Sequence, residues 1–162
     1  MKIYFFVVTT VFISIFGIST TAKAVSNKDV LYVMSNEGFS SQSYWDVNRY
    51  SWGYGTKAPG PNVKTNRVQA VMDLRAELVK IEGNLVRELG KAYSLLSNEK
   101  KRVLLDICFN AGSLKGFPKL KKLILAGKVK EASKELSTTS SDPKYKKGLK
   151  KRSESRKALW LK

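Results

Sequence analysis

Two carboxylates, Glu37 and Asp46, stand nine residues apart in the segment that runs from Glu37 to Gly55. We expect Glu37 at the end of a helix and Asp46 at the edge of a short hairpin that glycines close. Two carboxylates that face each other across a gap suit glycoside hydrolysis. One donates a proton to the leaving oxygen, and the other handles water or the developing cation.

The helix that positions Glu37 is expected to begin at the N-cap Ser26. Its predicted buried stripe is Val30, Leu31, Val33 and Met34. Gly38 fits a helix C-cap, which would place Glu37 in the last turn. The negative end of the helix dipole favours the protonated form of a carboxyl group there, and a general acid needs that bias.

A hairpin with a turn at Asn48 is expected over residues 42–54, where aromatic side chains are dense. Trp52 and Tyr54 are predicted as core residues of this hairpin. Helical periodicity resumes after Thr65 and is predicted to break near Gly83 or Gly90.

Ser97 is the expected N-cap of a helix that is apolar on most sides and ends at residues 110–112. A helix of that kind is buried, so it is the predicted central core helix. Shorter helices are predicted over residues 118–126, 129–136 and 144–161, with a loop at 137–141. The fold class predicted is α+β, mainly helical, with a small hairpin lobe and a larger helical lobe.

Residues 1–24 have the pattern of a secretory signal peptide. Lys2 precedes an uncharged, mostly apolar run, and Ala22-Lys23-Ala24 supplies small residues at a cleavage site. A retained membrane anchor is the alternative, although the run is short for a span and is diluted by Thr9, Thr10 and Ser14. We therefore predict a single domain over residues 25–162 in a protein that is exported and either periplasmic or secreted.

The chain carries a net charge of +17, so polyanions are its expected partners. For an exported protein these are anionic cell-wall polymers or membrane surfaces. No nucleic-acid-binding motif is present in the sequence, and no nucleic acid is expected as a partner. Taken one at a time, most of the lysines are expected to be solvated residues on helix faces.

The residue types narrow the chemistry further. The chain has no histidine, which excludes Ser-His and Cys-His catalysis and any histidine metal site. Cys108 is the only cysteine, and its apolar neighbours predict a buried side chain rather than a nucleophile. Carboxylate chemistry is the main option left, and no cofactor or metal is implied.

The motifs resemble a known family, the phage-type lysozymes of glycoside hydrolase family 24. The active-site segment of that family is similar to Glu37-Gly38-Phe39, Tyr44, Asp46 and Gly53-Tyr54-Gly55. Its later signatures resemble Phe109–Gly112 and Gly148–Arg152, in the same order, so that the similarity spans residues 29–160. The resemblance implies a lysozyme-like fold and cleavage of the β-1,4 bond between N-acetylmuramic acid and N-acetylglucosamine in peptidoglycan.

The resemblance also implies roles for individual residues. Glu37 matches the general acid, Asp46 the carboxylate that activates or holds water, and Ser51 the threonine that positions this water. The residues predicted to bind substrate are Tyr44, Trp45, Asn110 and Arg152. Arg152 matches an arginine near the catalytic glutamate, and a monomer that binds peptidoglycan is expected.

This sequence departs from the family pattern in the hairpin. Four residues separate Asp46 from Ser51, where the family has five, and serine replaces threonine. Thr56 stands where a histidine commonly follows the Gly-x-Gly. These departures put the roles of Asp46 and Ser51 in doubt more than that of Glu37, and Asp46 could instead brace the turn.

Three alternatives remain open from the sequence. A lytic transglycosylase would use Glu37 alone and have little need of Asp46. A non-catalytic, cationic wall-binding module would explain the shortened hairpin. A membrane-disrupting protein would use the last helix, in which Leu149 and Trp160 stand among many lysines.

Overall fold

The computed structural model describes residues 25–138 and 143–162. The predicted signal peptide, residues 1–24, lies outside the described residues, as does most of the predicted loop 137–141. Within the described part of the chain, none of the helices combines the length and apolarity that a membrane span requires.

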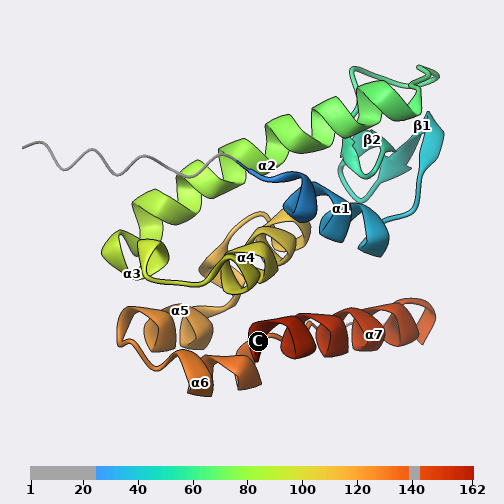
Figure 1. Cartoon of the computed structure of the whole chain (residues 1–162). Coiled ribbons are helices and arrows are strands. Elements are labelled where there is room, and N and C mark those ends of the chain that lie inside the picture. Colours follow the sequence, from blue (N-terminus) through green and yellow to red (C-terminus); the bar gives the residue numbers. More distant parts are fainter. Residues whose placement is uncertain (1–24, 139–142) are drawn as a thin grey trace, which may run out of the picture.

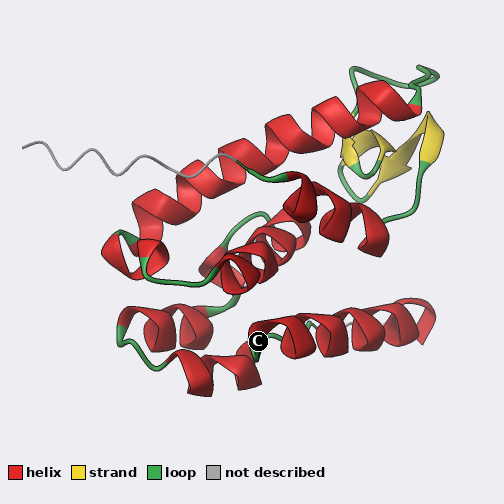
Figure 2. Ribbon diagram, viewed as in Figure 1, coloured by secondary structure: helices red, strands yellow, loops and turns green. Residues whose placement is uncertain are grey.

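The described residues form the mainly helical α+β architecture that the sequence predicts (Figures 1 and 2). A small antiparallel sheet lies at one end of a long helix, and the remaining helices pack into a larger lobe. The elements in chain order are α1 (Asn27–Asn36), β1 (Ser40–Asp46), β2 (Arg49–Gly53), β3 (Thr56–Lys57), α2 (Arg67–Leu89), α3 (Lys91–Ser94), α4 (Asn98–Ala111), η1 (Leu114–Gly116), α5 (Pro118–Leu125), α6 (Val129–Ala132), η2 (Ser133–Glu135) and α7 (Pro143–Trp160).

The sheet contains the predicted hairpin and a short third strand, in the order β1-β2-β3. Asp46 pairs with Arg49 at the end of the hairpin, and the chain reverses through Val47 and Asn48. Gly53 fixes the sheet against α2, because its φ is +58° and an added Cβ would lie 2.7 Å from the Cβ of Ala70. A larger residue at this position would push the hairpin away from α2.

Helix α4 is the central core helix, as predicted. Ser97 caps its start by accepting a hydrogen bond from the backbone N–H of Lys100, and Gly112 ends it with φ +76°. Helices α1, α2 and α7 all pack against α4. Its buried residues are Val103, Leu104, Leu105, Asp106, Ile107 and Cys108.

The break that the sequence predicts near Gly83 or Gly90 occurs at Gly90. Helix α2 runs unbroken through Gly83, because the packing of a continuous buried stripe outweighs the cost of one glycine. The predicted buried stripe of α1 needs one correction. In α1, Ser26 forms the predicted cap and Val30 and Val33 are buried, but Leu31 is 61% exposed. Leu31 follows directly after Val30, and adjacent helical residues point about 100° apart.

The predicted helices of the C-terminal third correspond to α5, to α6 with η2, and to α7. The expected helix over residues 129–136 is in fact one α-helical turn that continues as the 3₁₀ turn η2. Helix α7 returns across the molecule to pack against α4, so that the C-terminal helix faces the N-terminal helix α1 (Figure 1). Tyr54 is buried, as predicted, whereas Trp52 is only partly buried.

Candidate active site

Glu37 and Asp46 line the same cleft, which has a volume of about 640 Å³. Asp46 comes from the end of β1, and Glu37 follows the end of α1. Helix α7 supplies the opposite wall, and Asn110 contributes from the end of α4. The complete lining is Ser35, Asn36, Glu37, Tyr44, Asp46, Asn110, Gly148, Leu149, Lys151 and Arg152.

The alternation of side chains along β1 decides which hairpin residues reach the cleft. Tyr44 and Asp46 are two residues apart, so both point to the same face of the strand, and both line the cleft. Trp45 points to the other face, where it is 62% exposed and packs edge-on against Tyr50. Of the predicted substrate-binding residues, Tyr44, Asn110 and Arg152 therefore lie at the cleft and Trp45 does not.

Glu37 lies one residue beyond α1, which corrects its predicted place in the last helical turn. It is the C-cap residue, with the extended backbone angles φ −110° and ψ 146°. Gly38 does not adopt a left-handed conformation, so it does not end the helix in the predicted manner. The extended backbone carries the Glu37 side chain out of the helix and toward α7.

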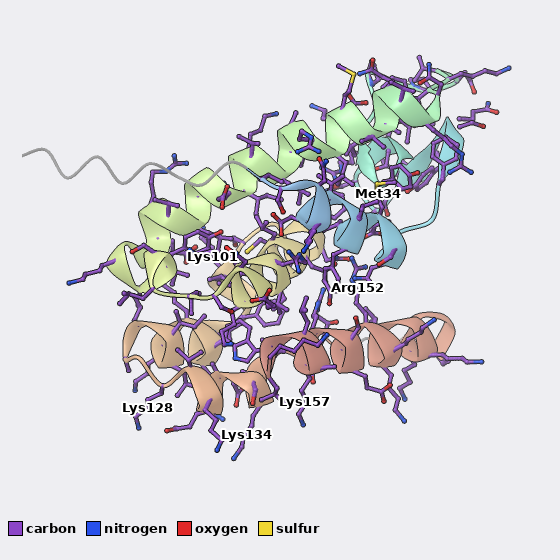
Figure 3. The ribbon with its side chains drawn as sticks, viewed as in Figure 1. Met34, Lys101, Lys128, Lys134, Arg152 and Lys157 are labelled. Carbon is purple, nitrogen blue, oxygen red and sulfur yellow. The ribbon has the colours of Figure 1, made fainter. Side chains whose placement is uncertain are left out.

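Arg152 joins Glu37 to a buried carboxylate. Its Nη2 donates to Oε1 of Glu37 at 2.5 Å and to Oδ1 of Asp106 at 2.8 Å. Its Nε also donates to Oδ2 of Asp106 at 3.2 Å. The guanidinium of Arg152 lies between α7 and α1 (Figure 3), and three distant segments of the chain meet at this one group.

The pKa of Glu37 is raised above its ordinary value of 4.5. Burial is the largest cause, because it disfavours the charged carboxylate. The charge and hydrogen bond of Arg152 oppose this effect, whereas the negative charge of Asp106 adds to it. The direction is the one expected from the sequence, and its largest cause is desolvation.

Asp106 is the site residue that sequence reasoning missed. It is fully buried in α4 and receives hydrogen bonds from two arginines of α7, including one from Nε of Arg156 at 2.6 Å. Burial alone would raise its pKa, but Arg152 and Arg156 outweigh burial and hold the pKa of Asp106 below its usual value. The available signal was a carboxylate inside the apolar run from Val103 to Phe109, together with two arginines spaced four residues apart.

Ser51 is fully buried, and its hydroxyl lies 3.5 Å from Oδ2 of Asp46. Since Ser51 has no exposed surface, its hydroxyl can affect a water molecule in the cleft only through Asp46. Asn110 donates to the backbone oxygen of Asp106 at 2.8 Å, and its side chain also lowers the pKa of Glu37 by hydrogen bonding.

The thiol of Cys108 does not compete with the carboxylates as the site. Cys108 is buried, as predicted, and burial raises the pKa of its thiol to about 12. Within residues 25–138 and 143–162, no group of three or more Asp, Glu, Cys or His side chains could hold a metal ion.

The described residues form a lysozyme-like fold, with the cleft at the junction of its two lobes. The chain is similar to the muramidase domain of SpmX from Asticaccaulis excentricus, with a TM-score of 0.71, 21% identity and coverage of 85% of this chain and 97% of that domain. It is also similar to the active form of the P1 phage endolysin Lyz, with a TM-score of 0.67, 16% identity and 84% coverage of each chain.

A third similar structure is a mutant of P22 lysozyme, with a TM-score of 0.66, 17% identity and coverage of 86% of this chain and 99% of that one. No protein-family model matches the sequence, and no curated protein sequence matches it. The similarity to the three solved structures confirms the predicted lysozyme-like fold.

Proposed function

We propose that this protein hydrolyses the β-1,4 glycosidic bond between N-acetylmuramic acid and N-acetylglucosamine in bacterial peptidoglycan. The observation that carries the proposal is a partly buried Glu37, with a raised pKa, in the same cleft as Asp46. The lysozyme-like fold supports it, as does the similarity to a muramidase domain and to a phage endolysin. We further propose that the protein reaches the wall by export, with residues 1–24 as the signal.

In the proposed reaction, the polysaccharide lies along the cleft between the hairpin and α7. Glu37 donates its proton to the glycosidic oxygen as the bond breaks. The Asp46 carboxylate assists water at the other side of the sugar, and Ser51 orients Asp46 from behind. The polar groups of Tyr44, Asn110 and Arg152 hold the sugar hydroxyl and amide groups.

Arg152 fixes the position of the Glu37 carboxyl group without preventing its protonation. An arginine paired with Glu37 alone would lower the pKa of the acid. Here the same guanidinium also contacts the Asp106 carboxylate, whose negative charge raises the pKa of Glu37. The cluster thus holds the acid in place while its net effect, with burial, favours the proton.

Cleavage should fall as pH rises, because Glu37 acts in its protonated form. Its folded-state pKa is above 4.5, so the descending limb of the pH–rate profile is expected above that value. The measurement is the initial rate of muropeptide release from purified peptidoglycan at constant ionic strength. A profile that descends only below pH 4.5 would contradict a Glu37 acid with a raised pKa.

Replacement of Asp46 separates hydrolysis from the alternative of a lytic transglycosylase. Asp46→Asn should lower the rate by about 10²-fold, the order expected for loss of a positioned acid–base group. A transglycosylase needs no water and would keep most of its rate. Asp73→Asn, on α2 away from the cleft, is the matched control and should have the wild-type rate.

The products provide the direct test of the proposed function. The protein is incubated with purified peptidoglycan, and the soluble fragments are analysed by mass. Muropeptides with a reducing end support hydrolysis, whereas anhydro-muropeptides would assign a transglycosylase. Protein that binds the wall and releases no fragments would leave a non-catalytic wall-binding module and refute the proposal.

A further inference from the structure

The positive charge is concentrated in the C-terminal third of the chain. Residues 113–162 contain 16 Lys and Arg and 4 Asp and Glu, a net charge of +12. Residues 25–112 contain 12 Lys and Arg and 9 Asp and Glu, a net charge of +3. The charge therefore belongs to the α5–α7 side of the molecule and not to the hairpin or α2.

Six exposed lysines form what we call the lysine face: Lys130, Lys134, Lys146, Lys147, Lys150 and Lys157. Lys134 and Lys157 point away from the body of the molecule, on the side opposite α2 (Figure 3). Lys146 and Lys150 share a stripe of α7 with Lys157, because they precede it by eleven and seven residues. A neighbouring stripe of α7 is buried through Arg156 and Trp160.

The ammonium groups of this face are free to bind an external anion. None of the six lies within 4.0 Å of a carboxylate oxygen of the described residues. The acidic residues Glu135 and Glu131 pair instead with Lys119 and Lys128. The arginines of α7 also stay inside, since Arg152 and Arg156 bind Asp106. What remains outside is a set of lysines with no carboxylate partner among residues 25–138 and 143–162.

We propose that the lysine face binds a phosphate-bearing polymer of the bacterial cell wall and holds the wall against the cleft. The choice of the wall rests on the proposed function. The face is continuous with the cleft, because Lys151 and Gly148 of the same helix line it. A wall strand in the cleft would therefore bring the attached polymers of the wall alongside α7.

The structure favours such a polymer over a membrane. An interfacial helix must bury an apolar face among lipids. In α7 that face is already occupied, since Trp160 is 1% exposed and its Nε1 donates to the backbone oxygen of Val129 at 2.9 Å. Nucleic acid is disfavoured because the face carries no arginine, the residue that most often reads bases. Lysine binds phosphate as a point charge, without the planar, bidentate recognition that arginine provides.

The test compares two variants with the same change in charge, both made in the full chain with Glu37→Gln so that the wall is not degraded. The first replaces Lys134, Lys147, Lys150 and Lys157 by Gln. The control replaces Lys57, Lys64, Lys80 and Lys91 by Gln. These lysines are exposed and belong to β3, the loop before α2, α2 and α3, outside the lysine face. Lys151 is left unchanged because it lines the cleft. Binding is measured by sedimentation with walls before and after acid removal of their phosphodiester polymers.

We expect the lysine-face variant to bind intact walls at least about 10-fold more weakly than the control, with a shallower dependence on salt. Stripped walls should bind the Glu37→Gln protein, the lysine-face variant and the control variant equally weakly. An equal loss of wall binding in both variants would show that net charge alone causes the effect, and it would overturn the proposal. Stronger competition by duplex DNA than by the isolated polymer, at equal phosphate concentration, or binding only to anionic vesicles, would also overturn it.

Failure of this proposal is distinguishable from failure of the proposed function. Release of reducing-end muropeptides from stripped walls depends on the cleft alone. Suppose that a lysine-face variant that retains Glu37 releases these muropeptides at the wild-type rate, and that intact walls bind the lysine-face and control variants equally. Hydrolysis is then supported, and the lysine face does not bind the polymer.

Discussion

Asp106→Ala is expected to lower the free energy of unfolding by about 3–5 kcal/mol, the cost of leaving buried charges without their partner. Asp106 and Arg156 are both fully buried, and Arg156 has no other carboxylate within ion-pair distance among the described residues. The remaining contacts of Arg156, to Thr138 and to the backbone oxygen of Asp106, are long at 3.3 and 3.4 Å. Denaturant titration measures the loss.

Glu135→Ala is the control for this prediction. Glu135 pairs with Lys119 at 2.7 Å, but the Lys119 side chain is 72% exposed. Breaking such a surface pair should cost less than about 1 kcal/mol. If the two variants lost the same stability, the buried cluster would not be the structural element that we describe.

Glu37→Gln should reduce muropeptide release by about 10²–10⁴-fold, the contribution of a positioned general acid. Glutamine keeps the shape of the side chain but has no carboxyl proton to donate to the glycosidic oxygen. The fold should survive, because Arg152 retains two hydrogen bonds to Asp106. The initial rate is measured together with thermal unfolding.

The stability of this variant has an expected sign. A raised folded-state pKa means that Glu37 contributes stability in its protonated form, and that this contribution is lost as pH rises through the pKa. At pH 7 the neutral glutamine should therefore be at least as stable as the wild type. Glu154→Gln, an exposed change on α7, serves as the activity control. A Glu37→Gln protein with the control's rate would remove the acid assignment.

The fold was largely predictable because its elements have strong local signals. Ser26 and Ser97 form the predicted caps, and the apolar run from Val103 to Cys108 becomes the central helix. The sequence left open whether the break falls at Gly83 or Gly90, and tertiary packing decides for Gly90. The prediction for the end of α1 was wrong, since Glu37 leaves the helix one residue earlier than its neighbour Gly38 suggested.

The candidate site was predictable residue by residue but not in its electrostatics. The spacing in β1 brings Tyr44 and Asp46 to the cleft, and the same alternation excludes Trp45. The role of Asp106 depends on the packing of α7 across α4. This packing brings Arg152 and Arg156 to Asp106 from 46 and 50 positions further along the chain, and no local pattern encodes such a contact. The pKa of Glu37 depends on that contact too.

The hydrogen bond between Glu37 and Arg152 joins residues 115 positions apart. In a chain that emerges from the ribosome N-terminus first, the acid is made well before the arginine that holds it. Closing so large a loop is entropically costly until the helices between have formed. The cleft is thus completed only after α7 has been made, and a nascent or truncated chain that lacks α7 contains both carboxylates without a working arrangement of them.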